Sequence, residues 1–439
     1  MEKFTKDTIV TFFTRIITAV FGIGVTIIIA RVLGPEKQGI YSLAILLPTT
    51  LIIFTGLGVN VSSIFYIGRK KYSPSEVFGN NVFFSVFLSV FMILIGLAII
   101  FFFADKIFPG VEKGYLFLAL LLIPFNLFFD LISSILLGLQ KIKEYNYISF
   151  LQSLLFLLLV AILVLGFKFE IKAVILTQIF SFIFGGTVLF FAVLKETKNL
   201  LLKINKNYFK DAISYGFKNY LGGILNFLHY RIDMFLINFF INPLAVGIYY
   251  IAVRLSESVW LVSQSAATVF FPKVVAETDG QRLKDFTPLV CRNILFITFL
   301  ISIVLFVFSH WLIVSFYSES FLSSVRPFQI LLVGTLFISG WRILANDIAA
   351  QGRPMLNTYI IGFSVLLNII LNILWIPKWG IEGAAYATVI SYFLLFLVTI
   401  FLYARLSGNR IIDIVFPKKS DVALYKNFLT ILRGRNKII

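Results

Sequence analysis

About twelve apolar runs of roughly 20 residues each fill most of this chain, and they constrain its fold more than any other feature. A helix of about 20 apolar residues crosses a bilayer core about 30 Å thick, so each run is long enough to span a membrane. Only 13% of the 439 residues are charged, and no interval between runs is large enough for a catalytic domain. The chain is therefore predicted to be an all-α integral membrane protein, and a soluble enzyme is excluded.

The apolar runs form two groups of six that are separated by a polar interval. They lie near residues 8–30, 40–67, 78–104, 114–138, 146–167, 172–194, 213–240, 244–271, 291–316, 327–350, 356–376 and 381–403. Four parts are expected from these limits: an N-terminal six-helix bundle over 1–194, a linker over 195–212, a C-terminal six-helix bundle over 213–403 and a tail over 404–439.

The basic residues are distributed unequally between the two sides of the predicted membrane. Of 38 Lys and Arg, 26 fall at the two ends of the chain and in the even-numbered connections, and 8 fall in the odd-numbered ones. Because basic loops stay in the cytoplasm, we expect a multi-pass protein of the cytoplasmic membrane with both termini inside the cell. The linker and the tail mix lysines with apolar residues, which is typical of amphipathic segments on anionic lipid.

The two halves of the chain repeat each other in sequence. The segment Gly34-Pro35-Glu36-Lys37-Gln38-Gly39-Ile40-Tyr41 matches Asn242-Pro243-Leu244-Ala245-Val246-Gly247-Ile248-Tyr249 after a shift of 208 residues, with Pro, Gly, Ile and Tyr in common. A second match, at a shift of 212 residues, pairs Gln140-Lys141 with Gly352-Arg353. Since six helices is an even number, the two repeats run in the same direction, which predicts an axis along the membrane normal and a central cavity between two bundles.

The segments Ala30-Arg31-Val32-Leu33-Gly34-Pro35 and Gly380-Ile381-Glu382-Gly383-Ala384-Ala385-Tyr386-Ala387-Thr388 resemble polysaccharide-type flippases. These flippases belong to the multidrug/oligosaccharidyl-lipid/polysaccharide exporter superfamily. The resemblance covers about residues 5 to 405 and implies two six-helix bundles that work by alternating access. It also implies a lipid-linked oligosaccharide cargo, such as an undecaprenyl-diphosphate-linked O-antigen unit, that moves from the inner to the outer leaflet. Membrane lipids and a polysaccharide polymerase or ligase are the partners that it implies, and nucleic acid is not among them.

Four arginines lie inside the predicted spans, where an ionised side chain is costly and is by default a sign of function. A guanidinium stays charged and binds two phosphate oxygens at once, so these residues suit a diphosphate or another anionic head group. Depth along the helices brings two of them near the midplane and leaves the other two nearer the inner side. The candidate cargo-binding residues are Arg254, Arg231, Arg15 and Arg342.

Acidic residues and a histidine accompany the arginines within the spans. An internal ion pair is the simplest alternative for Arg254 and Glu257, which lie three positions apart on one helix face. His229 and Asp233 are one turn apart and could share a proton or bind a cation. The candidates for ion coupling are Asp233, Glu257, His229, Asp130 and Asp347.

The matched turns are candidate gate elements. Gly34 and Pro35 in the first repeat, and Asn242 and Pro243 in the second, join helices at the outer ends of the two bundles. Both turns are short, so whole helices have to move if the cavity opens and closes at this end. We expect these turns to approach each other when the cavity faces the cytoplasm.

No nucleotide-binding motif and no Cys/His set for a metal occur, so we expect neither cofactor nor metal. Two alternatives to the flippase stay open. A cation-coupled exporter of small molecules has an acidic and aromatic cavity, and a membrane-embedded ligase or polymerase carries a large extracytoplasmic loop. Every predicted outer connection is about ten residues or fewer, which argues against the enzyme.

Overall fold

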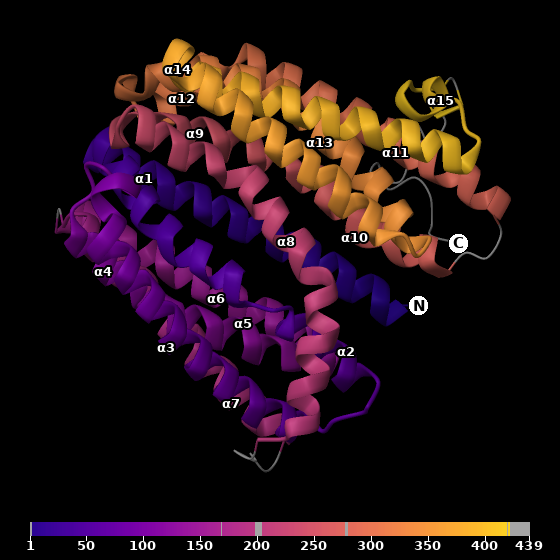
Figure 1. The fold of residues 1–439 in the computed structure, drawn as a ribbon, viewed down its shortest axis with the longest axis horizontal. Coiled ribbons are helices and arrows are strands. Elements are labelled where there is room, and N and C mark those ends of the chain that lie inside the picture. The colour runs from indigo at the N-terminus through magenta and orange to yellow at the C-terminus, as the bar shows by residue number, and fades with distance from the viewer. Residues whose placement is uncertain (1, 168, 198–203, 277–279, 419, 422–439) are drawn as a thin grey trace, which may run out of the picture. The chain divides into compact units, whose positions relative to one another are not determined.

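The computed structural model describes residues 2–167, 169–197, 204–276, 280–418 and 420–421. The described residues form helices and no strand (Figure 1). The helices are α1 Glu2–Thr55, α2 Val59–Gly68, α3 Pro74–Ile107, α4 Lys113–Leu120, α5 Leu122–Gly138, α6 Ile142–Val160, η1 Ala161–Gly166, α7 Ile171–Thr197, α8 Lys206–Phe240, α9 Pro243–Ser258, α10 Trp260–Ala276, α11 Gly280–Val307, α12 Ser309–Tyr317, η2 Glu319–Ser324, α13 Val325–Ala350, α14 Pro354–Ser407 and α15 Ile411–Val415. Each of the twelve predicted spans coincides with one helix or with two consecutive ones, which confirms the all-α membrane fold.

Two of the helices each contain two predicted spans. Gly34 in α1 and Gly380 in α14 have non-helical backbone angles, so each glycine marks a sharp turn between two consecutive spans. Among the described residues, eight helices are long and apolar enough to cross a membrane, or nine if the bent pair α9–α10 is counted as one span. This number is below twelve because the turns at Gly34 and Gly380 each join two predicted spans in one helix, and because α8, which contains the seventh predicted span, is not among these helices.

The chain divides into two compact units. Unit 1 comprises Met1–Arg254, His310–Pro327 and Ile369–Ala384, and unit 2 comprises Leu255–Ser309, Phe328–Asn368 and Ala385–Ile439. In unit 1, α1 packs along α6, and α5 packs against α2, α3 and α7 (Figure 1). The side chains of α5 that fill the centre of this bundle are apolar or small and are buried, as in Leu131, Ile132, Ser134 and Ile135.

Unit 2 is held together partly by polar contacts between helical segments. Ser364 Oγ donates a hydrogen bond to the Ser391 carbonyl oxygen at 2.8 Å, and Asn368 Nδ2 donates to Ser391 Oγ at 3.2 Å. All three residues are buried. Such hydrogen bonds join helices in a medium where the hydrophobic effect between them is weak.

The segment predicted as a linker continues directly into the seventh span. The Asn205 side chain accepts hydrogen bonds from the backbone N–H groups of Asn207 and Tyr208 and so caps α8. The start of α8 packs on α2 and α3, where Tyr208 is fully buried and the Phe209 ring stacks on Phe84 at 4.6 Å. Residues 198–203 of the predicted linker and 422–439 of the predicted tail lie outside the described residues.

The second sequence match has the same backbone conformation in both repeats. Gln140 and Gly352 each have a positive φ, at 58° and 81°, two positions after the last residue of a helix. The following residues, Lys141 and Arg353, donate backbone hydrogen bonds to the carbonyls of residues 136 and 348, five positions earlier. This is the pattern of a Schellman helix end, and it occurs at positions related by the 212-residue shift.

Large apolar side chains remain exposed along the spans. Phe102 in α3 is 77% exposed and Val307 in α11 is 69% exposed. Soluble proteins rarely expose apolar surface on this scale, whereas hydrocarbon surrounds it at no cost in a bilayer. The chain is a multi-pass membrane protein.

Candidate functional site

The turns at Gly34 and Asn242 have local causes. Gly34 has φ 79° and ψ 176°, a conformation open to glycine, and Pro35 restarts the helix without needing a hydrogen bond for a backbone N–H. In the second repeat Asn242 Oδ1 accepts a hydrogen bond from the Ala245 backbone N–H at 2.9 Å, and Pro243 is the first residue of α9. We call the end of unit 1 that contains these turns the Gly34 end.

At the Gly34 end, two repeat-related glycines lie against each other. A Cβ atom on Gly39 would fall on the Pro243 carbonyl oxygen and lie 2.8 Å from the Gly247 backbone nitrogen. A Cβ atom on Gly247 would fall on the Pro35 carbonyl oxygen and lie 2.8 Å from the Gly39 backbone nitrogen. The contact is reciprocal, as at an interface with a two-fold axis, because Gly39 and Gly247, like Pro35 and Pro243, differ by 208 positions. Only glycine permits two helix backbones to approach this closely.

Further contacts close the same end of unit 1. A Cβ atom on Gly110, in the loop before α4, would lie 2.9 Å from Cγ of Pro243. Ser324 Oγ donates a hydrogen bond to the Ile248 carbonyl oxygen at 2.7 Å. The hydroxyls of Thr26 and Tyr317 share a hydrogen bond at 3.3 Å. All of these residues belong to unit 1, so this end of the unit is tightly packed.

Two tyrosines at matched positions follow the glycines. Tyr41 donates a hydrogen bond from its hydroxyl to Gln178 Oε1 on α7 at 2.9 Å. Tyr249 donates to Asp233 Oδ2 on α8 at 2.7 Å. Both tyrosines are buried, and the 208-residue shift relates them. The repeat thus conserves the donor within this chain and changes the acceptor from a neutral amide to a carboxyl group.

Arg254 lies next to these tyrosines. It is on α9, two turns after Gly247, and its Nη2 would be 3.1 Å from a Cβ atom placed on Gly22 of α1. The guanidinium interacts electrostatically with Tyr41 and with Tyr317. Arg254 therefore has its guanidinium against α1 and interacts electrostatically with two phenols, and a guanidinium can bind anionic oxygens.

Three further candidates lie along α8. Asp233 is 3% exposed, and besides the Tyr249 hydroxyl it accepts the Met234 backbone N–H at 2.8 Å. His229, one turn earlier, is 2% exposed and its ring stacks on Tyr230. Arg231 is half-buried, and its Nη1 donates to the Tyr230 carbonyl oxygen at 2.9 Å. The buried carboxyl group of Asp233 and the buried imidazole of His229 thus lie one turn apart on α8. The guanidinium of Arg231, which lies between them in the sequence, belongs to a half-buried side chain.

The last two candidates in unit 1 are on other helices. Arg15 on α1 is exposed. Asp130 on α5 is also exposed, and its Oδ2 accepts a hydrogen bond from Asn60 Nδ2 on α2 at 3.0 Å. Asp130 therefore has a neutral amide as a hydrogen-bond partner.

Unit 2 contains the remaining candidates. Arg342 on α13 donates from Nη1 to Ser263 Oγ at 3.2 Å, and its guanidinium carbon lies 5.5 Å from the centre of the Trp260 ring. Asp347, one turn further on α13, is 1% exposed and accepts a hydrogen bond from Gln351 Nε2 at 3.1 Å. Glu257 on α9 is half-buried.

The structure thus brings together the two predicted gate turns, and it places Arg254, Arg231, Asp233 and His229 on α8 and α9 of unit 1. Arg342 and Asp347 lie together in unit 2. Sequence reasoning missed the hydrogen-bonding groups of this region, which are those of Thr26, Tyr41, Gln178, Tyr249 and Tyr317. The signal for two of them was present, since Tyr41 and Tyr249 are part of the repeated segment.

The chain is similar to known membrane proteins over most of its length. The family described as "Polysaccharide biosynthesis protein" matches residues 4–276. The capsular polysaccharide biosynthesis protein CapF of Staphylococcus aureus is 22% identical over 409 residues, which cover 90% of this chain and 98% of that protein.

Two solved structures have the same fold. A structure of the lipid II flippase MurJ in an inward closed conformation has a TM-score of 0.75 at 18% identity and covers 99% of this chain and 94% of that one. An inward-facing multidrug resistance MATE transporter of the MOP superfamily has a TM-score of 0.76 at 15% identity, covering 89% of this chain and 94% of that one.

Proposed function

We propose that this chain, which belongs to the polysaccharide biosynthesis protein family, moves a polyprenyl-diphosphate-linked oligosaccharide from the inner to the outer leaflet of the cytoplasmic membrane. The family, the similarity to a capsular polysaccharide biosynthesis protein and the fold shared with a lipid flippase support a flippase-type transporter. The nature of the lipid-linked cargo and the route that it takes are the parts that we propose.

The observation that carries the proposal is the position of Arg254. It lies about 10 Å along α9 from Gly247, in the helix that closes the Gly34 end, and its guanidinium interacts electrostatically with Tyr41 and Tyr317. A diphosphate carries charged oxygens that a guanidinium binds in pairs and that hydroxyl groups can further solvate. This supports a head-group site just below the closed end.

The same geometry supports alternating access. The reciprocal contact of Gly39 and Gly247 joins α1 to α9 by backbone atoms and not by a flexible loop, so it can separate only if whole helices move. We place the Gly34 end outside the cell, because the basic residues concentrate at the opposite ends of the helices. In this orientation the site is closed toward the outside, and cargo reaches it from the cytoplasmic leaflet.

The other candidates have roles within this proposal. Arg231 and Arg15 in unit 1, and Arg342 in unit 2, are further candidates for binding an anionic head group. Asp233 and His229 are the pair that we favour for coupling to an ion, because both are buried on one face of α8. The cargo then serves a polymerase or ligase of cell-surface polysaccharide outside the membrane.

A cation-coupled exporter of small molecules is the second candidate function. It is favoured by the buried Asp233 with its Tyr249 hydrogen bond, an arrangement that a proton or sodium ion could disturb, and by the MATE-like fold. The two functions differ in the charge of the cargo, since an exporter of cationic compounds gains nothing from Arg254.

Reconstitution into liposomes tests the proposal. A polyprenyl-diphosphate sugar is placed in both leaflets, and a membrane-impermeant lectin or hydrolase reports the fraction that reaches the outside. We expect transport by the wild type and loss with Arg254→Ala. Transport of cationic dyes together with failure to move the lipid-linked sugar would favour the second function.

A further inference from the structure

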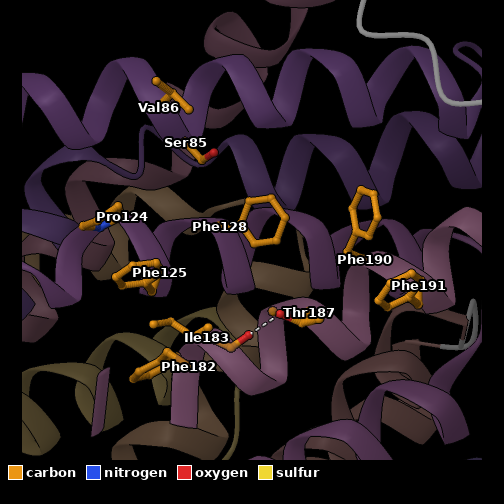
Figure 2. Close-up of a pocket in the computed structure, with 11 residues that line it drawn as sticks. Ser85, Val86, Pro124, Phe125, Phe128, Phe182, Ile183, Thr187, Phe190 and Phe191 are labelled. Carbon is orange, nitrogen blue, oxygen red and sulfur yellow. Dashed lines mark hydrogen bonds between the residues drawn. The ribbon is translucent and has the colours of Figure 1, made fainter. Parts of the chain in front are cut away.

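An apolar groove in unit 1 lies between α3, α5 and α7. It has a volume of about 530 Å³. Figure 2 shows the aromatic rings of Phe125 and Phe128 from α5, of Phe182, Phe190 and Phe191 from α7, and Val86 from α3. Among the described residues that line the groove there is no charged side chain, and the arginines proposed for the cargo are elsewhere in the chain.

The two hydroxyl groups of the groove need no ligand. Thr187 Oγ1 donates to the Ile183 carbonyl oxygen at 2.8 Å, as the dashed line in Figure 2 shows. Ser85 Oγ donates to the Val82 carbonyl oxygen at 2.8 Å. With both hydroxyls bonded to their own helices, the groove offers apolar contact alone and suits a hydrocarbon chain.

The groove exists because the helices approach closely behind it. Gly185 and Gly186 bring α7 against α5, where a Cβ atom would lie 2.8 Å from the Phe129 ring and 3.2 Å from the Phe128 ring. The Phe190 ring packs on the buried Phe78 of α3 at 5.9 Å. The rings are therefore fixed by packing, and the groove is part of the folded bundle.

A stripe on α7 connects the groove to a positive charge. Ile183, Thr187, Phe191 and Lys195 follow one another at intervals of four residues, and all four are exposed. They lie on one helix face, with Lys195 about 12 Å from Thr187 along the axis. Half of a bilayer core is about 15 Å thick, so a lipid with its head group at Lys195 has its chain at the depth of the groove.

The charges around Lys195 favour an anionic head group. Glu196, its neighbour, forms an ion pair with Lys141 at 3.0 Å, so this carboxylate is directed to another cation. Lys195 is in the last turn of α7, where the helix dipole favours a cation. A lysine at the membrane surface attracts anionic lipid by about 1 kcal/mol.

We propose that this groove binds one acyl chain of an anionic phospholipid whose phosphate group lies at Lys195. In the orientation proposed above, the lipid belongs to the cytoplasmic leaflet. It is a resident lipid and not the cargo, because the groove is lined by α3, α5 and α7 and not by the helices that carry Arg254 and Arg231.

Photolabelling of the full chain in phosphatidylcholine nanodiscs tests this site. The probe is phosphatidylglycerol with a photoreactive acyl chain, and labelled peptides are identified by mass spectrometry. We expect labels on α3 near Val86 and on α7 near Thr187.

A variant that fills the groove should label less. Thr187→Trp places an indole in the groove from an exposed position and should reduce the yield of labelled peptides at least fivefold. Ile183→Trp replaces it as the test if Thr187→Trp does not fold. Leu176→Trp is the matched control, exposed on the same helix but outside the groove, and should label like the wild type.

The head group is tested separately. A phosphatidylcholine probe should label the groove several-fold less than the phosphatidylglycerol probe, and Lys195→Gln should remove this difference, whereas Lys172→Gln at the other end of α7 should keep it. Equal labelling of Thr187→Trp and the wild type would overturn the proposal. Displacement of the label by polyprenyl phosphate but not by unlabelled phosphatidylglycerol would also overturn it and would make the groove a site for the cargo tail. Both results are independent of whether the chain transports sugar.

Discussion

Gly39 and Gly247 occupy the same place in two repeats 208 residues apart, and the backbone of each blocks the space that a side chain on the other would need. Their neighbours Pro35 and Pro243 supply the carbonyl oxygens in this contact. A parallel repeat predicts such an arrangement where two equivalent helices meet on the pseudo-two-fold axis. The contact therefore connects the sequence repeat to the closed end of unit 1.

Adding one methyl group at this contact should open the Gly34 end. Gly247→Ala places a Cβ atom against backbone, which cannot move aside as a side chain can, and overpacking of this kind costs about 1–3 kcal/mol. A cysteine at Thr26, which is 3% exposed, reports the change in a background with Cys291 replaced. We expect faster reaction with an impermeant thiol reagent added from outside.

Gly223→Ala is the control for this experiment, because a Cβ atom at Gly223 meets nothing within 4 Å. In the Gly223→Ala variant, the cysteine placed at Thr26 should react with the thiol reagent at the same rate as in the protein that carries Thr26→Cys without a glycine substitution. If the cysteine at Thr26 reacts at the same rate in Gly247→Ala and in Gly223→Ala, the result would contradict the role of the glycine contact.

Charge at Arg254 and Arg231 should be required for transport. Alanine at either position is expected to abolish flipping with normal expression, and lysine to keep part of it, because lysine retains the charge but not the planar fork of donors. Initial rates in proteoliposomes measure the effect. Arg31→Ala, which removes an exposed arginine of α1, should transport like the wild type; normal flipping by Arg254→Ala would exclude that residue from the site.

The matched tyrosines should differ in their contribution to stability. Tyr249→Phe removes a hydrogen bond to the buried carboxyl group of Asp233 and should cost about 1.5–3 kcal/mol if that group is ionised, because hydrogen bonds to charged groups are stronger. Tyr41→Phe removes one to a neutral amide and should cost about 0.5–1.5 kcal/mol. Thermal unfolding in detergent compares the two variants, and equal losses would indicate that Asp233 is neutral.

The described part of the tail is fastened to unit 2 by a buried ion pair. Arg292 on α11 donates from Nε and Nη2 to the two carboxylate oxygens of Asp421 at 2.6 and 2.7 Å. Removing one partner of a buried pair costs about 3–5 kcal/mol. Asp421→Asn should therefore release α15, detected as faster hydrogen exchange over residues 411–418, with Asp413→Asn, which loses an exposed pair with Lys418, as a milder comparison.

This contact also predicts a pH dependence. The Arg292 guanidinium holds the pKa of Asp421 below its usual range. A group whose pKa is lowered in the docked state stabilises that state fully above its ordinary pKa and loses the contribution as the pH falls through the lowered one. The protection of these amides, taken as the intrinsic exchange rate at each pH divided by the observed rate, should thus be high over 411–418 at neutral pH and fall only in acid. A fall in protection between pH 6 and 8 would contradict this account.

The sequence was sufficient to predict the helices and the repeat, because hydropathy and the Pro, Gly and Tyr spacing are local properties. It identified the turns at Gly34 and Asn242 from residues that set backbone conformation directly. The contact between Gly39 and Gly247 was not predicted, since it depends on how closely two distant helices pack. The partner of Tyr41 was equally hidden, because Gln178 is 137 positions away and shares no pattern with it.

The most direct test of the flippase account is a reversible crosslink across the two turns. Cysteines at Glu36 and Leu244, both exposed and each next to one of the turn prolines, are introduced with Cys291 replaced. The rate at which a polyprenyl-diphosphate sugar crosses the proteoliposome membrane is then measured before oxidation, after oxidation and after reduction. We predict that the crosslink forms, stops transport, and that reduction restores the rate. An unchanged rate in fully crosslinked protein would contradict transport by opening of the Gly34 end.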